Sequence, residues 1–363
     1  KADASCFLFL VSCFLLLVSL LLVSCFLLHT AVNGGQNMFR PQIKVVDCTI
    51  RDGGLMNKSK FSFDTVKNVY RAVCAAGIDI VELGYRNSKQ MFSVDEYGPW
   101  RFCDEENLKK IVGDTKSEMS DGKCSRTKIA VMQDAHKSSI DDVFPKSESV
   151  VDIIRVATYV KDIDEAIKLA NNATDKGYEA TINIMSVSVA LERELNEALQ
   201  QIDEETKITA CYIVDSFGAL YSEDIDFFVD KFKKYLKNKE IGIHCHNHQQ
   251  LGFANTITGI IRGANYLDGT LYGLGRAAGN CPLELLVSFL KNPKFDIRPL
   301  LEVIDKDIIP LSKEISWGYS IPYMITGILN RHPDVAMKYA ELDDEAKEKI
   351  GFLKFYEKIT NNP

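Results

Sequence analysis

The sequence predicts a (β/α)8 TIM barrel followed by a C-terminal helical extension, and three observations support this fold class. Short runs rich in β-branched residues alternate with amphipathic segments, eight such runs are present, and the 363 residues suffice for one barrel with an appendage. An open doubly wound sheet is the alternative, but no GxGxxG motif follows the first run, which disfavours its dinucleotide-binding form. The eight runs are Ile43–Val46, Ile78–Leu83, Lys128–Met132, Ile153–Ala157, Ala180–Met185, Thr209–Val214, Ile241–His244 and Tyr266–Leu271.

The segments between these runs have the periodicity of amphipathic helices. Most of them begin near a Ser, Asp or Asn cap or end at a Gly. The stretch Tyr85–Thr127 is too long for a simple loop, so we expect it to contain a helix and an insertion over the active-site face. The other predicted helices are Ser62–Ala76, Ile163–Lys176, Val189–Gln201, Glu223–Leu236 and Gln250–Ala264.

The composition is that of a globular protein rather than a disordered or nucleic-acid-binding one. Charged residues make up 26% of the chain and hydrophobic ones 46%, which excludes bulk disorder. The net charge of −7 gives the chain no electrostatic reason to bind nucleic acid. Three of the ten cysteines lie in an N-terminal apolar run and the others form no CxxC pair, so we expect reduced thiols and a cytoplasmic location.

The chain divides into three predicted parts. Residues 1–37 are apolar and low in complexity, and three interpretations stay open: a sequence artefact, a cleaved signal, or a membrane anchor. Membrane association is expected only if this segment is genuine. Residues 38–292 form the predicted barrel and residues 293–363 the helical extension. Within the extension, Phe295–Tyr339 is apolar enough to cover a barrel face or to form a homodimer contact.

Polar residues recur where the predicted strands end, and the active sites of TIM barrels lie at those ends. The pair His244 and His246 is the sharpest feature, because residues two apart in an extended segment point to the same side and can bind one metal ion. Asp52, after the first strand, would be a neighbour once the barrel closes, and Asn280, expected to begin the helix after strand eight, can add an amide oxygen. Two His, one Asp and one Asn favour Mn²⁺ or Mg²⁺ over a closed thiolate zinc site. The alternative is that the histidines only make hydrogen bonds in a loop.

Two further features adjoin this predicted metal site. Arg51 could stabilise an enolate oxygen, or it could form a structural salt bridge to Glu82 or Asp215. Gly53 and Gly54 would let the backbone approach a small ligand, or they could form a plain turn.

Six motifs in order carry a family resemblance. They are DCTIRDGG (47–54), IIRVAT (153–158), TINIMS (181–186), CYIVDSFGAL (211–220), IHCHNHQQLGFAN (243–255) and GRAAGNCPLE (275–284). With these motifs the chain resembles the HMG-CoA-lyase-like, or DRE-TIM, metallolyase superfamily, from about residue 43 to residue 339. Within the superfamily it is most similar to the 4-hydroxy-2-oxovalerate aldolases, and the later segment KEISWGYSIPY (313–323) resembles the helical region after their barrel.

The resemblance implies a function and roles for individual residues. It implies a lyase that uses Mn²⁺ or Mg²⁺ to cleave or form a 4-hydroxy-2-oxo acid, with a pyruvate-like 2-oxo acid and an aldehyde as partners, and that often pairs with an aldehyde dehydrogenase. Asp52, His244 and His246 would bind the metal, with Asn280 nearby or ligating, and Arg51 would stabilise the pyruvate enolate. Ser186 would contact the substrate carboxylate. Tyr319 stands where the aldolases carry a functional tyrosine; Tyr323 is a rival match, and helix packing is the alternative role of both.

The sequence departs from the family pattern at the general base. The aldolases have a histidine three residues after the metal-binding Asp, and here that position is Leu55. His248 is our expected substitute, with a metal-bound water as the other candidate. The alternative is that His248 only lines its loop.

Other residues bear on the choice of branch. Gly54 stands where the isopropylmalate synthases have Glu, and the segment 274–278 lacks the cysteine of the HMG-CoA lyases. No lysine ends a predicted strand, which disfavours a Schiff-base aldolase. Two alternatives to the aldolase remain: an acyl-CoA and 2-oxo acid condensing transferase, and a non-catalytic barrel that has lost its base.

Overall fold

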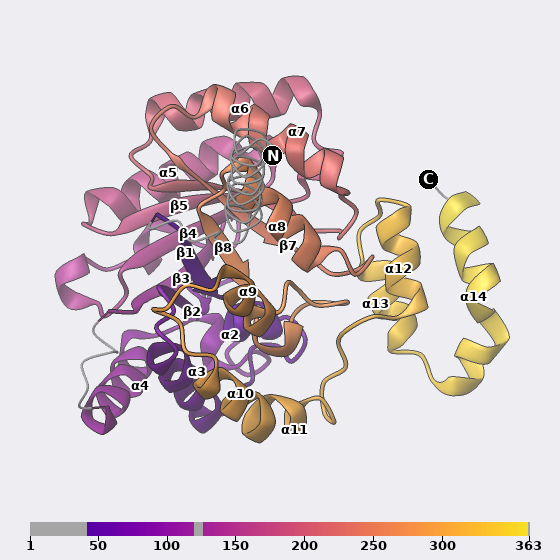
Figure 1. The fold of residues 1–363 in the computed structure, drawn as a ribbon, viewed down its shortest axis with the longest axis horizontal. Helices are drawn as coiled ribbons and strands as arrows, with labels where there is room; N and C mark the ends of the chain where they lie inside the picture. The colour runs from indigo at the N-terminus through magenta and orange to yellow at the C-terminus, as the bar shows by residue number, and fades with distance from the viewer. Residues whose placement is uncertain (1–41, 120–125, 362–363) are drawn as a thin grey trace, which may run out of the picture. The chain divides into compact units, whose positions relative to one another are not determined.

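A computed structural model describes residues 42–119 and 126–361, and its core is a closed barrel of eight parallel strands in chain order (Figure 1). The pairing of Lys44 with Tyr266 and of Asp47 with Gly269 joins the first strand to the last and closes the barrel. The predicted TIM barrel is therefore confirmed, and each strand overlaps its predicted run. The strands are β1 Lys44–Asp47, β2 Ile80–Tyr85, β3 Lys128–Asp134, β4 Ile153–Thr158, β5 Glu179–Ile184, β6 Ala210–Asp215, β7 Glu240–Cys245 and β8 Tyr266–Gly269.

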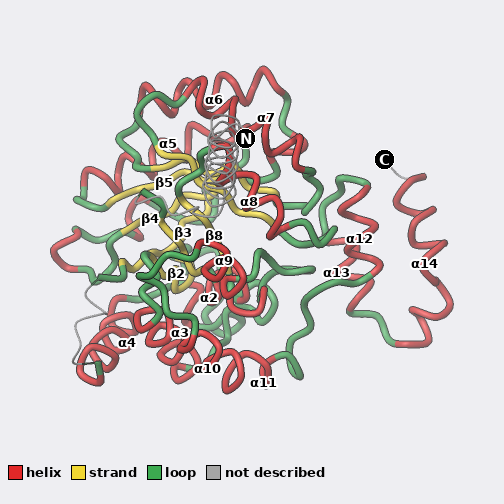
Figure 2. The backbone as a smooth tube through the Cα atoms, in the orientation of Figure 1, coloured by secondary structure: helices red, strands yellow, loops and turns green. Residues whose placement is uncertain are grey.

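Helices follow the strands and surround the barrel (Figure 2). The side chain of Ser62 caps the first of them by accepting a hydrogen bond from the Thr65 amide at 3.0 Å, as its position before an apolar-periodic segment predicted. The helix expected from Val189 begins three residues later, because residues 187–189 form a 3-10 turn. The barrel helices are α3 Phe63–Ala75, α4 Glu105–Glu118, α5 Ile163–Asp175, α6 Glu192–Glu205, α7 Ser222–Tyr235, α8 Gly252–Arg262 and α9 Leu283–Leu290.

The segment after β1 folds as a one-turn helix, α2 Thr49–Gly53, with Gly54 as the residue that follows its end. The Asp52 amide donates to the Cys48 carbonyl at 2.9 Å, which closes the turn. The Leu271 amide donates to the Thr49 hydroxyl, also at 2.9 Å, and so ties the turn to the end of β8. The turn thus fixes the direction in which Asp52 projects.

The long segment between β2 and β3 contains the expected helix, α4, and before it an insertion that is exposed over most of residues 89–97. Trp100 of this insertion is fully buried, and its indole N–H donates to the Phe61 carbonyl at 2.9 Å. The Arg101 guanidinium lies over the Tyr85 ring, 4.8 Å from its centroid. The insertion therefore packs against the C-terminal end of β2.

The chain beyond the barrel is helical, with α10 Arg298–Val303, α11 Ile309–Leu311, α12 Ile321–Ile328, α13 Asp334–Ala340 and α14 Asp344–Asn361. An apolar cluster joins these last helices to the loop after β8, and its buried members include Ala277, Ala278, Tyr323, Tyr339 and Phe355. The predicted segment 1–37 lies outside the described residues. Across the described ranges, no helix has both the length and the apolarity needed to cross a lipid bilayer. The six cysteines within those ranges are free and buried.

Candidate metal centre and substrate cavity

The structure brings Asp52, His244 and His246 together at the C-terminal end of the barrel. Their potential ligand atoms lie within 4.8 Å of one another, and all three residues are buried. His244 lies in β7 and His246 one residue after its end, so the alternation of an extended chain turns both imidazoles to the same side. Asp52 comes from α2 on the neighbouring side of the closed barrel.

Asn280 lies beside these three residues, although not in the expected element. Its segment pairs with His246 in an isolated bridge, and α9 begins only at Leu283, so the prediction that Asn280 begins this helix is wrong. Gly275 leaves the space that the Asn280 amide occupies; a Cβ there would collide with that amide and lie 2.7 Å from Asp52 Oδ1.

Several polar atoms around this site are buried and have no hydrogen-bond partner among the described residues. They are His244 Nε2 and both side-chain amide atoms of Asn280. A buried polar atom without a partner is costly, and a metal ion bound here would satisfy the nitrogen and the amide oxygen. Two imidazoles, a carboxylate and an amide oxygen therefore fit a divalent ion such as Mn²⁺ or Mg²⁺.

A second cluster of metal-ligating side chains, Cys48, His244 and Asp268, does not fit a metal as well. Burial raises the pKa of the Cys48 thiol well above its ordinary value, so the thiolate needed for ligation is disfavoured. Asp268 Oδ2 is already engaged by Arg155 Nη2 at 2.7 Å and by His244 Nδ1 at 3.0 Å. We therefore assign Asp268 to holding His244.

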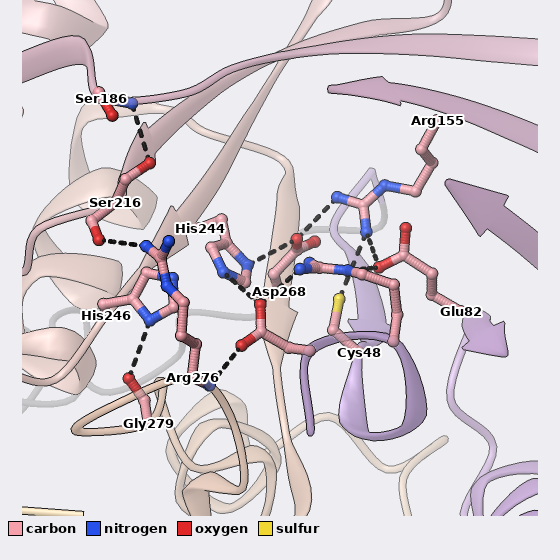
Figure 3. A network of polar contacts seen from close by, with 12 residues as sticks. Cys48, Glu82, Arg155, Ser186, Ser216, His244, His246, Asp268, Arg276 and Gly279 are labelled. Carbon is pink, nitrogen blue, oxygen red and sulfur yellow. Dashed lines mark hydrogen bonds and ion pairs between the residues drawn. The ribbon is translucent and has the colours of Figure 1, made fainter. Parts of the chain in front are cut away.

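A continuous network of buried charges supports the metal site (Figure 3). Arg155 donates to both Glu82, at 2.9 Å, and Asp268, at 2.7 Å. Glu82 in turn accepts from Arg51 Nε at 2.7 Å, and Arg51 Nη1 contacts the Asp52 carboxylate. The salt bridge from Arg51 to Glu82 that the sequence left open is therefore present. Each charge has a partner, as buried charges require.

The surroundings favour the ligating forms of Asp52 and His246, whereas against the effect of burial the hydrogen bonds with Asp268 and Asp52 raise the pKa of His244. Burial alone would raise the pKa of Asp52, but the Arg51 charge and the His244 side chain hold it well below its usual range. Burial lowers the pKa of His246 well below its ordinary value. The Asp52 carboxylate is thus ionised and the His246 imidazole neutral, which are the ligating forms.

A cavity of about 60 Å³ opens beside the ligands. Its polar wall includes Arg51, Arg276 and Ser216, and no lysine is found among the described residues that line it. Another part of the lining is apolar, and this apolar wall consists of Leu55, Met132, Ala157, Val214 and Met185. Tyr85, Asp134 and Asn183 complete the lining. Such a volume suits a small ligand.

Besides Asn280, four of the residues expected at the site do not line this cavity. Ser186 is buried with a left-handed backbone, and its amide donates to the Ser216 hydroxyl at 2.8 Å, so that Ser216 faces the cavity instead (Figure 3). Gly53 backs onto Leu274 and Phe61. The other two are His248 and Tyr319.

His248 and Tyr319 both belong to the region where the C-terminal helices meet the barrel. His248 is fully buried, its ring lies 5.9 Å from that of His246 and 6.0 Å from that of Tyr323, and burial lowers its pKa to about 3. Neither of its ring nitrogens has a partner among the described residues. Tyr319 is 52% exposed. The structure thus brings neither residue to the cavity, and Tyr323 packs within the apolar cluster.

Two residues of the site escaped the sequence analysis. The Arg276 amide donates to Asp52 Oδ1 at 2.8 Å, and its guanidinium donates to the Ser216 carbonyl at 2.7 Å. Asp268, which fixes His244, is an acid within the apolar strand run Tyr266–Leu271, and that anomaly was a usable signal. For Arg276 the one available signal was its place in the glycine-rich segment after the last predicted strand.

Known proteins resemble this chain in sequence. The chain is similar to the 4-hydroxy-2-oxovalerate aldolase of Thermus thermophilus, with 28% identity over 271 residues that cover 74% of this chain and 75% of that one. It is also similar to the oxaloacetate decarboxylase of Mycobacterium tuberculosis, with 26% identity over 265 residues and 73% of each chain.

Solved structures show the same barrel. The N-terminal domain of a candidate aldolase from Bacteroides vulgatus matches with a TM-score of 0.72 and 29% identity, over 85% of this chain and all of that one. The HMG-CoA lyase of Brucella melitensis matches in fold, with a TM-score of 0.56 at 14% identity, over 72% of this chain and 95% of that one. The HMGL-like family model matches residues 42–305, and the chain therefore belongs to the HMGL-like family.

Proposed function

We propose that the chain is a divalent-metal-dependent lyase that cleaves a 4-hydroxy-2-oxo acid to pyruvate and an aldehyde, or runs the reverse condensation. The observation that carries the proposal is the buried set Asp52, His244, His246 and Asn280 beside a small cavity lined by Arg51. A bound Mn²⁺ or Mg²⁺ would supply Lewis-acid polarisation of the 2-oxo acid.

The chain's own residues divide the remaining work. Arg51 is held by Glu82 and offsets the negative charge that develops on the enolate oxygen when the C3–C4 bond breaks. Asp268 holds His244 in the orientation and tautomer for ligation. Ser216 and the Arg276 guanidinium line the polar wall and suit the substrate carboxylate. The apolar wall around Leu55 then receives the carbon chain of the aldehyde.

A specific observation supports a second candidate, the decarboxylation of oxaloacetate. Leu55 lines the cavity at the position where the resemblance places the base, and a leucine accepts no proton. Loss of carbon dioxide from oxaloacetate gives the same pyruvate enolate without a proton acceptor, and one relative is named an oxaloacetate decarboxylase.

Parallel assays of the purified chain with added Mn²⁺ test the proposal. Pyruvate released from a series of 4-hydroxy-2-oxo acids supports the aldolase, and pyruvate released only from oxaloacetate, above a protein-free Mn²⁺ blank, supports the decarboxylase. Free CoA from acetyl-CoA and a 2-oxo acid would instead support the condensing transferase. No turnover in any assay, with Mn²⁺ still bound, would leave the non-catalytic barrel.

The proposal includes a cellular location and protein partners. The free buried cysteines suit a reducing, cytoplasmic compartment. An aldehyde dehydrogenase partner and a homodimer follow from the resemblance and from the apolar C-terminal extension. Light scattering of the chain alone and with a candidate dehydrogenase tests both.

A further inference from the structure

The proposed cleavage needs a group that accepts the proton of the C4 hydroxyl, and the apolar wall supplies none. Leu55 packs with Met185 against a buried cluster of Tyr85, Met132 and Ala157. This cluster lines the same cavity as Arg51 and the metal-ligating residues. The proton acceptor must therefore stand elsewhere on the cavity surface.

Few groups in the described cavity lining can accept a proton at neutral pH. The imidazoles belong to His244 and His246, which we assign to the metal together with the Asp52 carboxylate. One other carboxyl group lines the cavity, that of Asp134. The Tyr85 phenol is disfavoured as a base, because burial raises its pKa above its ordinary value.

Asp134 stands on the side of the cavity where the aldehyde part of the substrate belongs. It is the last residue of β3, two positions after Met132, so both side chains project to the same side of the strand. Met132 belongs to the cluster that packs against Leu55. The carboxyl of Asp134 thus lies next to the apolar wall and nearer the barrel mouth.

The surroundings of Asp134 suit a base. Its side chain is 15% exposed, and its Oδ2 pairs with Lys137 Nζ at 2.7 Å. Burial raises the pKa of Asp134, while the charges of Lys137, Arg101 and His136 oppose the rise without cancelling it. A carboxylate with a raised pKa is a stronger base than an ordinary surface aspartate.

We propose that Asp134 is the catalytic base of this chain and takes the role that Leu55 cannot perform. The inference rests on the proposed aldolase function. The Asp134 carboxylate removes the C4 hydroxyl proton as the C3–C4 bond breaks; the C4–O bond becomes the aldehyde carbonyl, and the bond pair passes into the pyruvate enolate beside Arg51. The proton on Asp134 then protonates C3 of the enolate, which gives pyruvate and restores the carboxylate.

The test compares two reactions of one variant. Asp134→Asn should lower kcat for cleavage of a 4-hydroxy-2-oxo acid by about 10²–10⁴-fold, the usual contribution of a general base. Its Mn²⁺ affinity and its rate of oxaloacetate decarboxylation, corrected for a protein-free Mn²⁺ blank, should stay within about threefold of the parent chain, because decarboxylation needs no such base. Asp95→Asn, an exposed aspartate of the insertion before α4, is the matched control.

A rescue variant separates a base from a residue that only supports the site. Adding Leu55→His to Asp134→Asn puts an imidazole on the same cavity and should recover at least about 10-fold of the lost cleavage rate. Cleavage by Asp134→Asn within threefold of the parent, or a parallel loss of decarboxylation and Mn²⁺ affinity, would overturn the inference. If the parent chain itself cleaves no 4-hydroxy-2-oxo acid, the proposed aldolase function is wrong whatever Asp134 does. Decarboxylation of oxaloacetate by that chain would then show that the cleavage reaction is wrong and the metal site is not.

Discussion

The two walls of the cavity differ in chemistry and in their agreement with the family pattern. The metal wall, which we define as Arg51, Asp52, His244 and His246, is charged and follows the motifs of the metallolyases. The apolar wall, which consists of Leu55, Met132, Ala157, Val214 and Met185, has a leucine where the aldolases have a histidine. The difference teaches that enolate stabilisation and proton acceptance depend on different residues, because the metal wall is intact although the apolar wall lacks the histidine.

The two walls also differ in how strongly a substitution should affect stability. On the metal wall every buried charge depends on a partner, so removing one leaves another unpaired, at about 3–5 kcal/mol. The apolar wall contains no charges, and a substitution there changes shape and transfer energy only. Substitutions on the metal wall should therefore have the larger effects.

The largest effect is expected from Asp52→Asn. An asparagine keeps the size of the side chain but removes the ligand charge and the contact with Arg51, so the cleavage rate should fall by about three orders of magnitude or more. Far-ultraviolet circular dichroism should stay that of the parent barrel. An Asp52→Asn protein that turns over at a tenth of the parent rate would remove Asp52 from the proposed ligands.

Asp268→Asn tests the layer behind the metal wall. Asp268 accepts from His244 Nδ1 and pairs with Arg155, so losing its charge should weaken Mn²⁺ binding by about 10–100-fold. Saturating Mn²⁺ should restore most of the rate, because the ligands themselves remain. A lost rate that excess Mn²⁺ does not recover would mean that Asp268 acts through Arg51 rather than through His244.

Leu55→His probes the apolar wall in the otherwise unchanged chain. With Asp134 present, a second base should raise the cleavage rate only a few-fold, since one acceptor already serves the reaction. Oxaloacetate decarboxylation should not rise with it. A gain of about 100-fold or more would show that the parent chain lacks an effective base and would favour the decarboxylase reading of the site.

The smallest effect on turnover is expected from Asp47→Asn. This substitution instead measures how much the burial of a charged carboxylate below the metal wall lowers the stability of the fold. Burial raises the pKa of Asp47 to about 7, against about 3.9 in an unfolded chain. Between these values the folded state holds a proton that the unfolded state has lost, so the stability of the parent falls as pH rises from about 4 to 7.

Asparagine has no charge to bury, so the stability gained by Asp47→Asn should be larger at pH 8 than at pH 5, by about 2 kcal/mol. Urea unfolding of both proteins at the two pH values measures this difference. An equal effect at both values would mean that the Asp47 carboxyl ionises in the fold as easily as in the unfolded chain.

The sequence predicted the parts of this molecule that depend on local order. The period of β-branched runs located all eight strands, and the spacing of His244 and His246 predicted that both side chains point to the same side. The prediction of a base at His248 relied on the same alternation continuing. The strand ends at Cys245 and residues 248–249 form a turn, in which the Gln250 amide donates to the Asn247 carbonyl at 3.0 Å, so the alternation does not continue to His248.

Other parts depend on contacts between distant segments. Asp268 and Arg155 meet across 113 positions of sequence only because the barrel closes in one register. Asn280 stays extended before α9 because it bridges to His246, a pairing that no local pattern indicates. Whether Leu55, Asp134 and Tyr85 share a cavity likewise depends on the tertiary fold, and in particular on the turn α2.

Titration of the metal-free chain with Mn²⁺, followed by electron paramagnetic resonance, tests the central claim most directly. The account predicts one strongly bound ion per parent chain, an unchanged affinity in Asp95→Asn, and loss of that ion in His244→Ala while the barrel stays folded. A folded His244→Ala protein that binds Mn²⁺ with the parent affinity would contradict the proposed site.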